Sequence, residues 1–197
     1  MKNRITKNRI MWKQIQDANQ DRKLIFIHTP KCGGAYVSKI LNDLNISKKG
    51  HHQAIKNEGI NFTVIRDPID RFQSLLNYRL GESAPRNDWP KHLDYVYNDT
   101  NVTLNNLITK MTDAEILGFR PYSSLIFWTT NIDIIITIDQ LHELLSFFGY
   151  QYDENKYAPI NMSLKVRGSI NNKNRNRIAN LYKDDIILFN KVKHSSL

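Results

Sequence analysis

A lysine and two glycines stand together at residues 31–34, between an apolar run and a helical pattern. Glycines at such a junction let the backbone approach a ligand closely, and the first turn of the following helix offers unpaired N–H groups to an anion. Lys31 adds a mobile positive charge beside Gly33 and Gly34. This lysine precedes the glycines, whereas in the GxxxxGK[ST] loop it follows one. The segment therefore predicts a phosphate-binding loop of a different type; the alternative is an ordinary glycine turn with a surface lysine.

A second basic segment follows the apolar run at residues 62–65. Arg66 comes directly after this run, and Ser74 lies eight residues later. Pro68 fits the first turn of a helix, with Asp67 as its N-cap. Arg66 then lies at the carboxyl end of a strand and Ser74 about one turn into the helix, where the two side chains could hold a second phosphate. The alternative is that the charges around this helix start only form ion pairs with one another.

The elements that must position these residues alternate along the chain. Apolar runs predict buried strands at residues 24–28, 62–65 and 134–138. Helical periodicity predicts helices at residues 35–44, 70–80, 104–111, 140–148 and 174–190, the last with a candidate break near Asp184. Strands alternating with helices indicate a parallel sheet with helices on both faces. Ligands of such sheets bind at the carboxyl ends of the strands, where both basic segments are expected.

Length and composition bound the class of protein. The 197 residues suit one domain, which we assign to residues 23–197, after a basic segment at residues 1–22. One cysteine excludes an intrachain disulfide framework and a cysteine-built zinc site. The sequence has neither a signal-peptide pattern nor a stretch of ~20 apolar residues, so we expect a cytoplasmic protein with no membrane partner.

The net charge of +9 divides unevenly, with balances of +8, −5 and +6 over residues 1–50, 51–162 and 163–197. Basic ends of this kind suit a nucleic acid or a small polyanion, or are simply solvated lysines.

Taken together, the segments LIFIHTPKCGGAYVSKIL and FTVIRDPIDRFQSLLNY resemble the 5′-phosphosulfate loop and the 3′-phosphate segment of sulfotransferases. Weaker likenesses to the glycan-modifying branch extend the resemblance over most of residues 23–190; they are residues 119–125, IDIIITID, Asn161 and LYKDDIILF. The resemblance implies a three-layer α/β/α sandwich with a central parallel sheet, the P-loop-like sulfotransferase fold. It also implies 3′-phosphoadenosine 5′-phosphosulfate (PAPS) as co-substrate, its bisphosphate (PAP) as product, and no metal.

The resemblance assigns cofactor-binding roles to two groups of residues. Those for the 5′-phosphosulfate are Lys31, Cys32, Gly33, Gly34 and the backbone amides of Ala35 and Tyr36. Those for the 3′-phosphate are Arg66, Ser74 and Arg167, the last in a Val-Arg-Gly segment that looks like a late basic loop of the family. Ala35 and Tyr36 stand where relatives often have Thr or Ser. Two side-chain hydroxyls are thereby missing or displaced, while the backbone cradle is kept.

Sulfuryl transfer requires stabilisation of the leaving phosphate and a base for the acceptor hydroxyl. Lys31 is the candidate for the first role, because charge develops on the bridging oxygen near it. For the base we favour His52 over His51, since several glycan sulfotransferases carry a basic histidine between the first helix and the second predicted strand. Glu58 is the alternative base.

We therefore expect a PAPS-dependent sulfotransferase that acts on a hydroxyl, or an amine, of an acceptor such as a carbohydrate or a small hydroxylated molecule. A kinase-type enzyme is disfavoured, because a Walker lysine and a clear magnesium-binding acid do not follow the loop. The second hypothesis is a non-catalytic protein on the same fold that binds a nucleotide or, through its basic ends, a nucleic acid.

Overall fold

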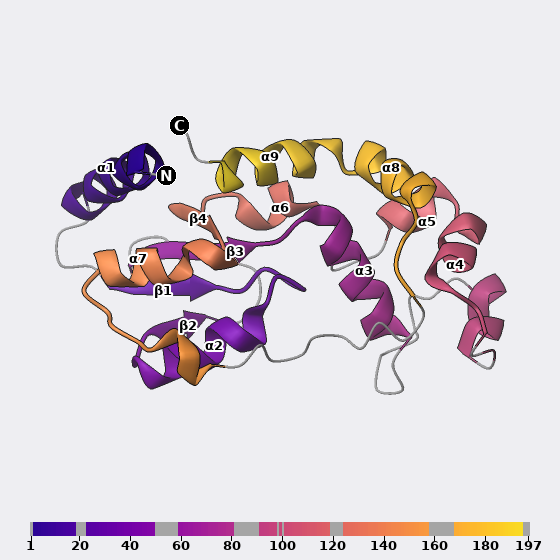
Figure 1. Cartoon of the computed structure of the whole chain (residues 1–197), viewed down its shortest axis with the longest axis horizontal. Helices are drawn as coiled ribbons and strands as arrows, with labels where there is room; N and C mark the ends of the chain where they lie inside the picture. The colour runs from indigo at the N-terminus through magenta and orange to yellow at the C-terminus, as the bar shows by residue number, and fades with distance from the viewer. Residues whose placement is uncertain are drawn as a thin grey trace.

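Four parallel strands form a sheet in the order β2-β1-β3-β4 (Figure 1). The computed structural model describes residues 2–18, 23–49, 59–80, 91–97, 99, 101–118, 124–157 and 168–194. The strands are β1 (Leu24–Ile27), β2 (Ser47–Lys49), β3 (Ile60–Ile65) and β4 (Ile134–Thr137). Their registers pair Leu24 with Ile60 and Phe62 with Ile134. Because all pairs are parallel, the carboxyl ends of the strands meet at one edge of the sheet.

Helices connect and flank the strands. The α-helices are α1 (Lys2–Ala18), α2 (Gly34–Asp43), α3 (Pro68–Arg79), α4 (Leu104–Lys110), α5 (Asp113–Leu117), α6 (Leu125–Thr129), α7 (Leu141–Phe147), α8 (Asn172–Leu181) and α9 (Lys183–Lys193). The 3₁₀ helices are η1 (Lys91–Tyr97), η2 (Ile138–Gln140) and η3 (Glu154–Lys156).

The predicted α/β class and parallel sheet are confirmed. Each predicted strand and helix is present, with ends that differ by about two residues or fewer except in the last helix, which breaks at Tyr182 and extends to Lys193. Strand β3 starts earlier than predicted because Asn61 lies inside it, where its backbone N–H donates to Asp133 Oδ2 at 2.7 Å. The polar strand β2 was not predicted. It pairs only with β1, at the edge of the sheet, where backbone hydrogen bonds need no apolar sequence.

Apolar clusters cover both faces of the sheet. On one face, Phe26 and Phe62 pack with residues of α2 and α7, and the fully buried Trp12 of α1 joins the same cluster. The Trp12 and Phe147 ring centres are 5.7 Å apart. On the other face, Ile65 packs with Leu125 of α6 and with residues of α9. A third cluster joins α3, α4, α5 and α8 beyond the sheet (Figure 1).

Helix α9 is fixed in place by a buried carboxylate in its first turn. Asp185 is 2% exposed and accepts hydrogen bonds from Ser124 Oγ at 2.6 Å and from the backbone N–H of Leu125 at 2.7 Å. The carboxylate thereby satisfies the start of α6 and ties it to α9. Farther along α9, Gln140 Nε2 donates to the carbonyl of Val192 at 3.3 Å. These contacts hold the end of α9 beside the carboxyl end of β4.

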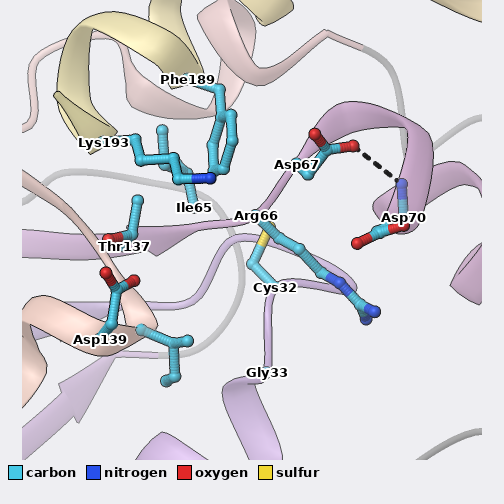
Figure 2. A pocket seen from close by; sticks show the side chains of 11 residues that line it. Cys32, Gly33, Ile65, Arg66, Asp67, Asp70, Thr137, Asp139, Phe189 and Lys193 are labelled. Atoms are coloured by element: carbon cyan, nitrogen blue, oxygen red, sulfur yellow. Dashed lines mark hydrogen bonds between the residues drawn. The ribbon is translucent and has the colours of Figure 1, made fainter.

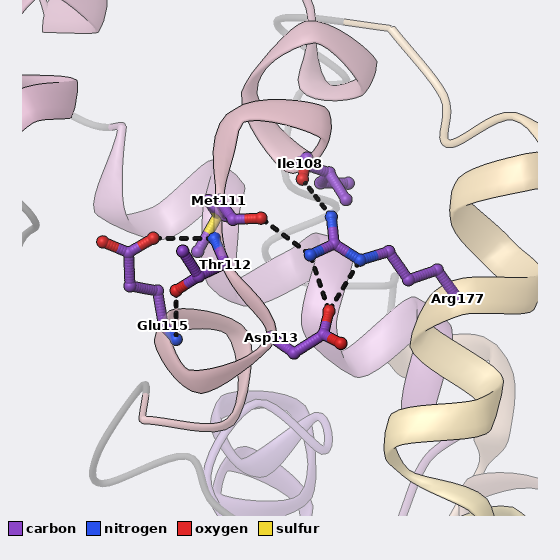
Figure 3. Close-up of polar contacts among 6 residues, drawn as sticks. All are labelled: Ile108, Met111, Thr112, Asp113, Glu115 and Arg177. Atoms are coloured by element: carbon purple, nitrogen blue, oxygen red, sulfur yellow. Dashed lines mark hydrogen bonds and ion pairs between the residues drawn. The ribbon is translucent and has the colours of Figure 1, made fainter.

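Arg177 of α8 joins three helices through its guanidinium group (Figure 3). It donates to the carbonyls of Ile108 and Met111, both at 2.7 Å, and its Nε and Nη2 atoms donate to Asp113 Oδ1 at 2.8 and 2.6 Å. The two carbonyls are at the C-terminal end of α4, where no helical N–H reaches them.

Arg177→Met is expected to lower the free energy of unfolding by about 2–3 kcal/mol, because two carbonyls lose a charged donor. Asp113→Asn should cost under about 1 kcal/mol, since the side chain of Asp113 is 60% exposed. Urea unfolding measures both values, with Arg175→Met on the same helix as the control. Equal losses for Arg175→Met and Arg177→Met would contradict this role.

Candidate functional site

The loop after β1 is anchored to β3 by two buried threonines. The Oγ1 atoms of Thr29 and Thr63 are 2.8 Å apart, and Thr63 Oγ1 donates to the carbonyl of Ile27 at 2.7 Å. The loop then turns sharply, since Lys31 and Gly33 have φ values of 62° and 83°. Glycine tolerates this left-handed conformation, whereas for a lysine it costs roughly 1–2 kcal/mol. The loop is therefore a fixed structure that accepts strain at Lys31.

Helix α2 begins directly after this loop, and its first turn faces outward. Gly33 is the N-cap and provides no side-chain cap, and the first helical hydrogen bond runs from the N–H of Val37 to the carbonyl of Gly33 at 3.1 Å. The preceding N–H groups, including those of Gly34 and Ala35, have no acceptor within the helix. Such a helix start favours an anion. Tyr36, in the same turn, is half-buried against the core.

Gly34 has a second role, which is steric. A Cβ atom at this position would overlap the imidazole of His28, whose ring packs directly on the glycine. The other side of that imidazole is near Phe26, with ring centres 6.1 Å apart. The imidazole thus fills the space beneath the first turn of α2 and supports the loop.

One face of α3 contacts the loop. Arg71 Nε donates to the carbonyl of Pro30 at 3.0 Å, and Lys31 Nζ lies 4.4 Å from the centre of the Tyr78 ring. Ser74 lies between Arg71 and Tyr78 on the same helical face, at spacings of three and four residues. Ser74 is buried, with 8% of its surface exposed. The predicted partners Lys31 and Ser74 therefore lie on adjoining elements.

Arg66 occupies the end of β3, directly before the cap of α3. Asp67 accepts from the N–H groups of Ile69 and Asp70 at 2.9 and 3.1 Å, which confirms the predicted N-cap. Among the described residues, Arg66 forms no ion pair, and its side chain is exposed. Burial, and then the positive charge of Arg66, lower the pKa of Lys31 from its ordinary value of 10.5. The two cations are close enough to repel each other.

A pocket of about 470 Å³ opens at the carboxyl edge of the sheet (Figure 2). This volume is within the range of small-molecule sites. The lining residues come from the loop after β1, the ends of β3 and β4, and α9. They are Cys32, Gly33, Ile65, Arg66, Asp67, Asp70, Thr137, Ile138, Asp139, Phe189 and Lys193.

The pocket therefore brings Cys32, Gly33 and Arg66 together, as the carboxyl-edge prediction requires. Burial raises the pKa of the Cys32 thiol, so this group lines the pocket as a neutral apolar surface. Sequence reasoning assigned no role to Asp139, Phe189 or Lys193. For Asp139 the position after a strand was an available signal, whereas nothing in the sequence links Lys193 to the edge of the sheet.

Four predicted residues, His51, His52, Glu58 and Arg167, lie outside the described residues. Within the described ranges there is no group of three or more His, Cys, Asp or Glu side chains that could hold a metal ion. In the same ranges, no helix combines the length and the apolar character that crossing a membrane requires.

Compared with known proteins, the chain matches no family model, no curated protein and no solved structure. The chemistry must therefore be inferred from the site itself. A helix start, two unpaired cations and a partly apolar pocket form a site for an anionic organic molecule.

Proposed function

We propose that the protein is a sulfotransferase that moves a sulfuryl group from PAPS to a hydroxyl, or an amine, of an acceptor such as a carbohydrate or a small hydroxylated molecule. In this proposal the fold is the three-layer, P-loop-like sandwich of sulfotransferases. The observation that carries the proposal is the pairing of Lys31 and Arg66 at the carboxyl ends of β1 and β3, two neighbouring parallel strands.

The position of the two cations supports a ligand with two separate phosphate groups. Neighbouring strands lie about 4.8 Å apart, so the loop after β1 and the end of β3 offer two anion positions side by side. The first has the N–H groups of α2 and Lys31, and the second has Arg66. A nucleoside that carries one phosphate on its 5′ oxygen and another on its 3′ oxygen matches this arrangement. Binding would also relieve the repulsion between the cations.

PAPS, when bound, supplies an activated sulfuryl group whose S–O bond to the phosphate breaks as a new bond to the acceptor oxygen or nitrogen forms. Lys31 would then stabilise the charge that develops on the leaving phosphate. Tyr78 holds the Lys31 ammonium at the edge of the loop through a cation–π contact worth about 0.5–1 kcal/mol. His52, with His51 or Glu58 as alternatives, would accept the proton of the acceptor group.

Isothermal titration calorimetry with PAP, ATP and an oligonucleotide tests the proposal. We expect PAP to bind most tightly, and Arg66→Met to weaken it about 10- to 100-fold, because a charged donor to phosphate is lost. Arg175→Met, on α8, is the control. Tighter binding of ATP would favour a kinase-type enzyme, and binding of the oligonucleotide alone would favour the nucleic-acid hypothesis. Transfer of labelled sulfate from PAPS to an acceptor panel then separates an enzyme from a non-catalytic nucleotide-binding protein.

The affinity for PAP should fall as the pH rises toward the pKa of Lys31. Only the ammonium form attracts the ligand, so this part of the affinity is present below the pKa and is lost above it. Because burial and Arg66 lower that pKa, the loss should begin at a lower pH than for an ordinary lysine. Calorimetry between about pH 7 and 10 measures the effect. Lys31→Arg, which stays charged, should show no such loss; a parallel decline in both proteins would assign it to another group.

A further inference from the structure

The ends of three adjacent strands line the pocket in spatial order. Gly33 follows β1, Arg66 follows β3, and the Thr137–Asp139 segment follows β4. At about 4.8 Å per strand, the end of β4 is about 10 Å from the end of β1 within the sheet. If the 5′-phosphate is held after β1 and the 3′-phosphate at β3, the base of the nucleotide reaches the end of β4. This step rests on the proposed function.

The end of β4 offers an apolar surface for a planar base. Ile138 is 43% exposed, and its Cδ1 atom would lie 3.8 Å from a Cβ placed on Gly33. It is therefore directly beside the phosphate-binding loop. Phe189 closes the opposite wall of the pocket, where it packs with Ile65 and Cys32 (Figure 2).

Two charged groups, one acidic and one basic, line the same end of the pocket. Asp139 belongs to η2, and Lys193 belongs to the last turn of α9, with its Nζ atom 5.7 Å from the centre of the Phe189 ring. The contact of Gln140 with Val192 holds η2 and the end of α9 together. Among the described residues neither Asp139 nor Lys193 forms an ion pair. Both groups therefore remain available to a ligand.

We propose that Asp139 and Lys193 recognise the base of the nucleotide and make the pocket selective for adenine over 6-oxopurines. The edge of adenine presents a donor, the 6-amino group, beside an acceptor, N1. A carboxylate accepts from the first, and an ammonium donates to the second. Guanine and hypoxanthine present a 6-oxo acceptor beside an N1–H donor, so each atom would face a group of the wrong kind.

Competition between PAP and inosine 3′,5′-bisphosphate tests this selectivity, because the two ligands differ only at positions 6 and 1 of the base. We expect the protein to prefer PAP by roughly 10- to 100-fold in calorimetry. Asp139→Asn and Lys193→Met should each reduce the preference to below about 3-fold, since each removes one of the two complementary groups. Asp184→Asn and Lys191→Met, both on exposed positions of α9, should retain it.

The outcomes separate this inference from the proposed function. Equal affinity of the wild-type protein for the two bisphosphates, or an unchanged preference in both pocket variants, would overturn base recognition and leave bisphosphate binding intact. Failure of the wild-type protein to bind either bisphosphate would overturn the proposed function, and with it the inference. Arg66→Met serves as the internal reference, because it should weaken both ligands by the same factor. Thermal unfolding of each variant verifies that it is folded.

Discussion

Replacing Lys31 with methionine is expected to lower the turnover number for sulfuryl transfer by about 10²–10³-fold. Methionine keeps much of the length and apolar character of the lysine stem but removes the charge. Lys31 is the cation within the loop itself, and the strained φ of 62° fixes its backbone next to the start of α2. Stabilisation of the leaving phosphate would be lost, while the N–H groups of α2 and the guanidinium of Arg66 would still hold the product. We therefore expect PAP affinity to fall by no more than about 10-fold.

The measurement is steady-state transfer of labelled sulfate, combined with calorimetry of PAP binding. Lys31→Arg should recover part of the turnover, because the positive charge is kept but the ammonium is not. Lys39→Met, on α2, removes a lysine that lies 5.9 Å from the centre of the Tyr157 ring, and it should leave turnover unchanged. A turnover number for Lys31→Met within about 3-fold of wild type would contradict the catalytic role.

Gly34→Ala is expected to remove PAP binding and to lower the free energy of unfolding by about 1–3 kcal/mol. The new methyl group would overlap the imidazole of His28, and the backbone on both sides is fixed, by the β1 strand and by the start of α2. The loop must therefore shift, and the N–H groups that face the ligand shift with it. Calorimetry and urea unfolding measure the two effects.

A second substitution distinguishes steric overlap from a general cost of alanine. In Gly34→Ala with His28→Ala, the imidazole is gone, so stability should be higher than the two single losses predict and PAP binding should return at least in part. Gly149→Ala is the control for alanine at a glycine, because its φ of 85° costs backbone energy while no atom lies within 4 Å of the new Cβ. Additive losses in the double variant would show that the imidazole is not the obstacle.

The sequence was sufficient where the physics is local. The apolar runs predicted β1, β3 and β4 because a strand buried on both faces has few alternatives to an apolar sequence. The cap by Asp67 and the helix after Pro68 were predictable for a similar reason, since both depend on chemistry within a few residues. The expected meeting of Gly33 and Arg66 followed from the parallel arrangement alone, because parallel strands end at the same edge.

Other features depend on contacts that the sequence does not record. The packing of His28 on Gly34 requires a particular side-chain direction at the end of β1. Trp12 is buried against α7 although the surrounding sequence is basic and polar. Lys193 reaches the pocket only because Asp185 and Gln140 fix the direction of α9. In each case a tertiary contact decides the position, and local propensity is silent on it.

The register that pairs Phe62 with Ile134 also has a kinetic meaning. More than half of the described chain must be ordered, and a long intervening segment closed, before β4 can join the sheet and the pocket acquires its far wall. Loop closure of this kind is paid for before the contacts form, so the pocket belongs to the last stage of folding. A ligand that recognises the finished pocket can then act as a lock on the native state: it slows unfolding and leaves the rate of folding unchanged.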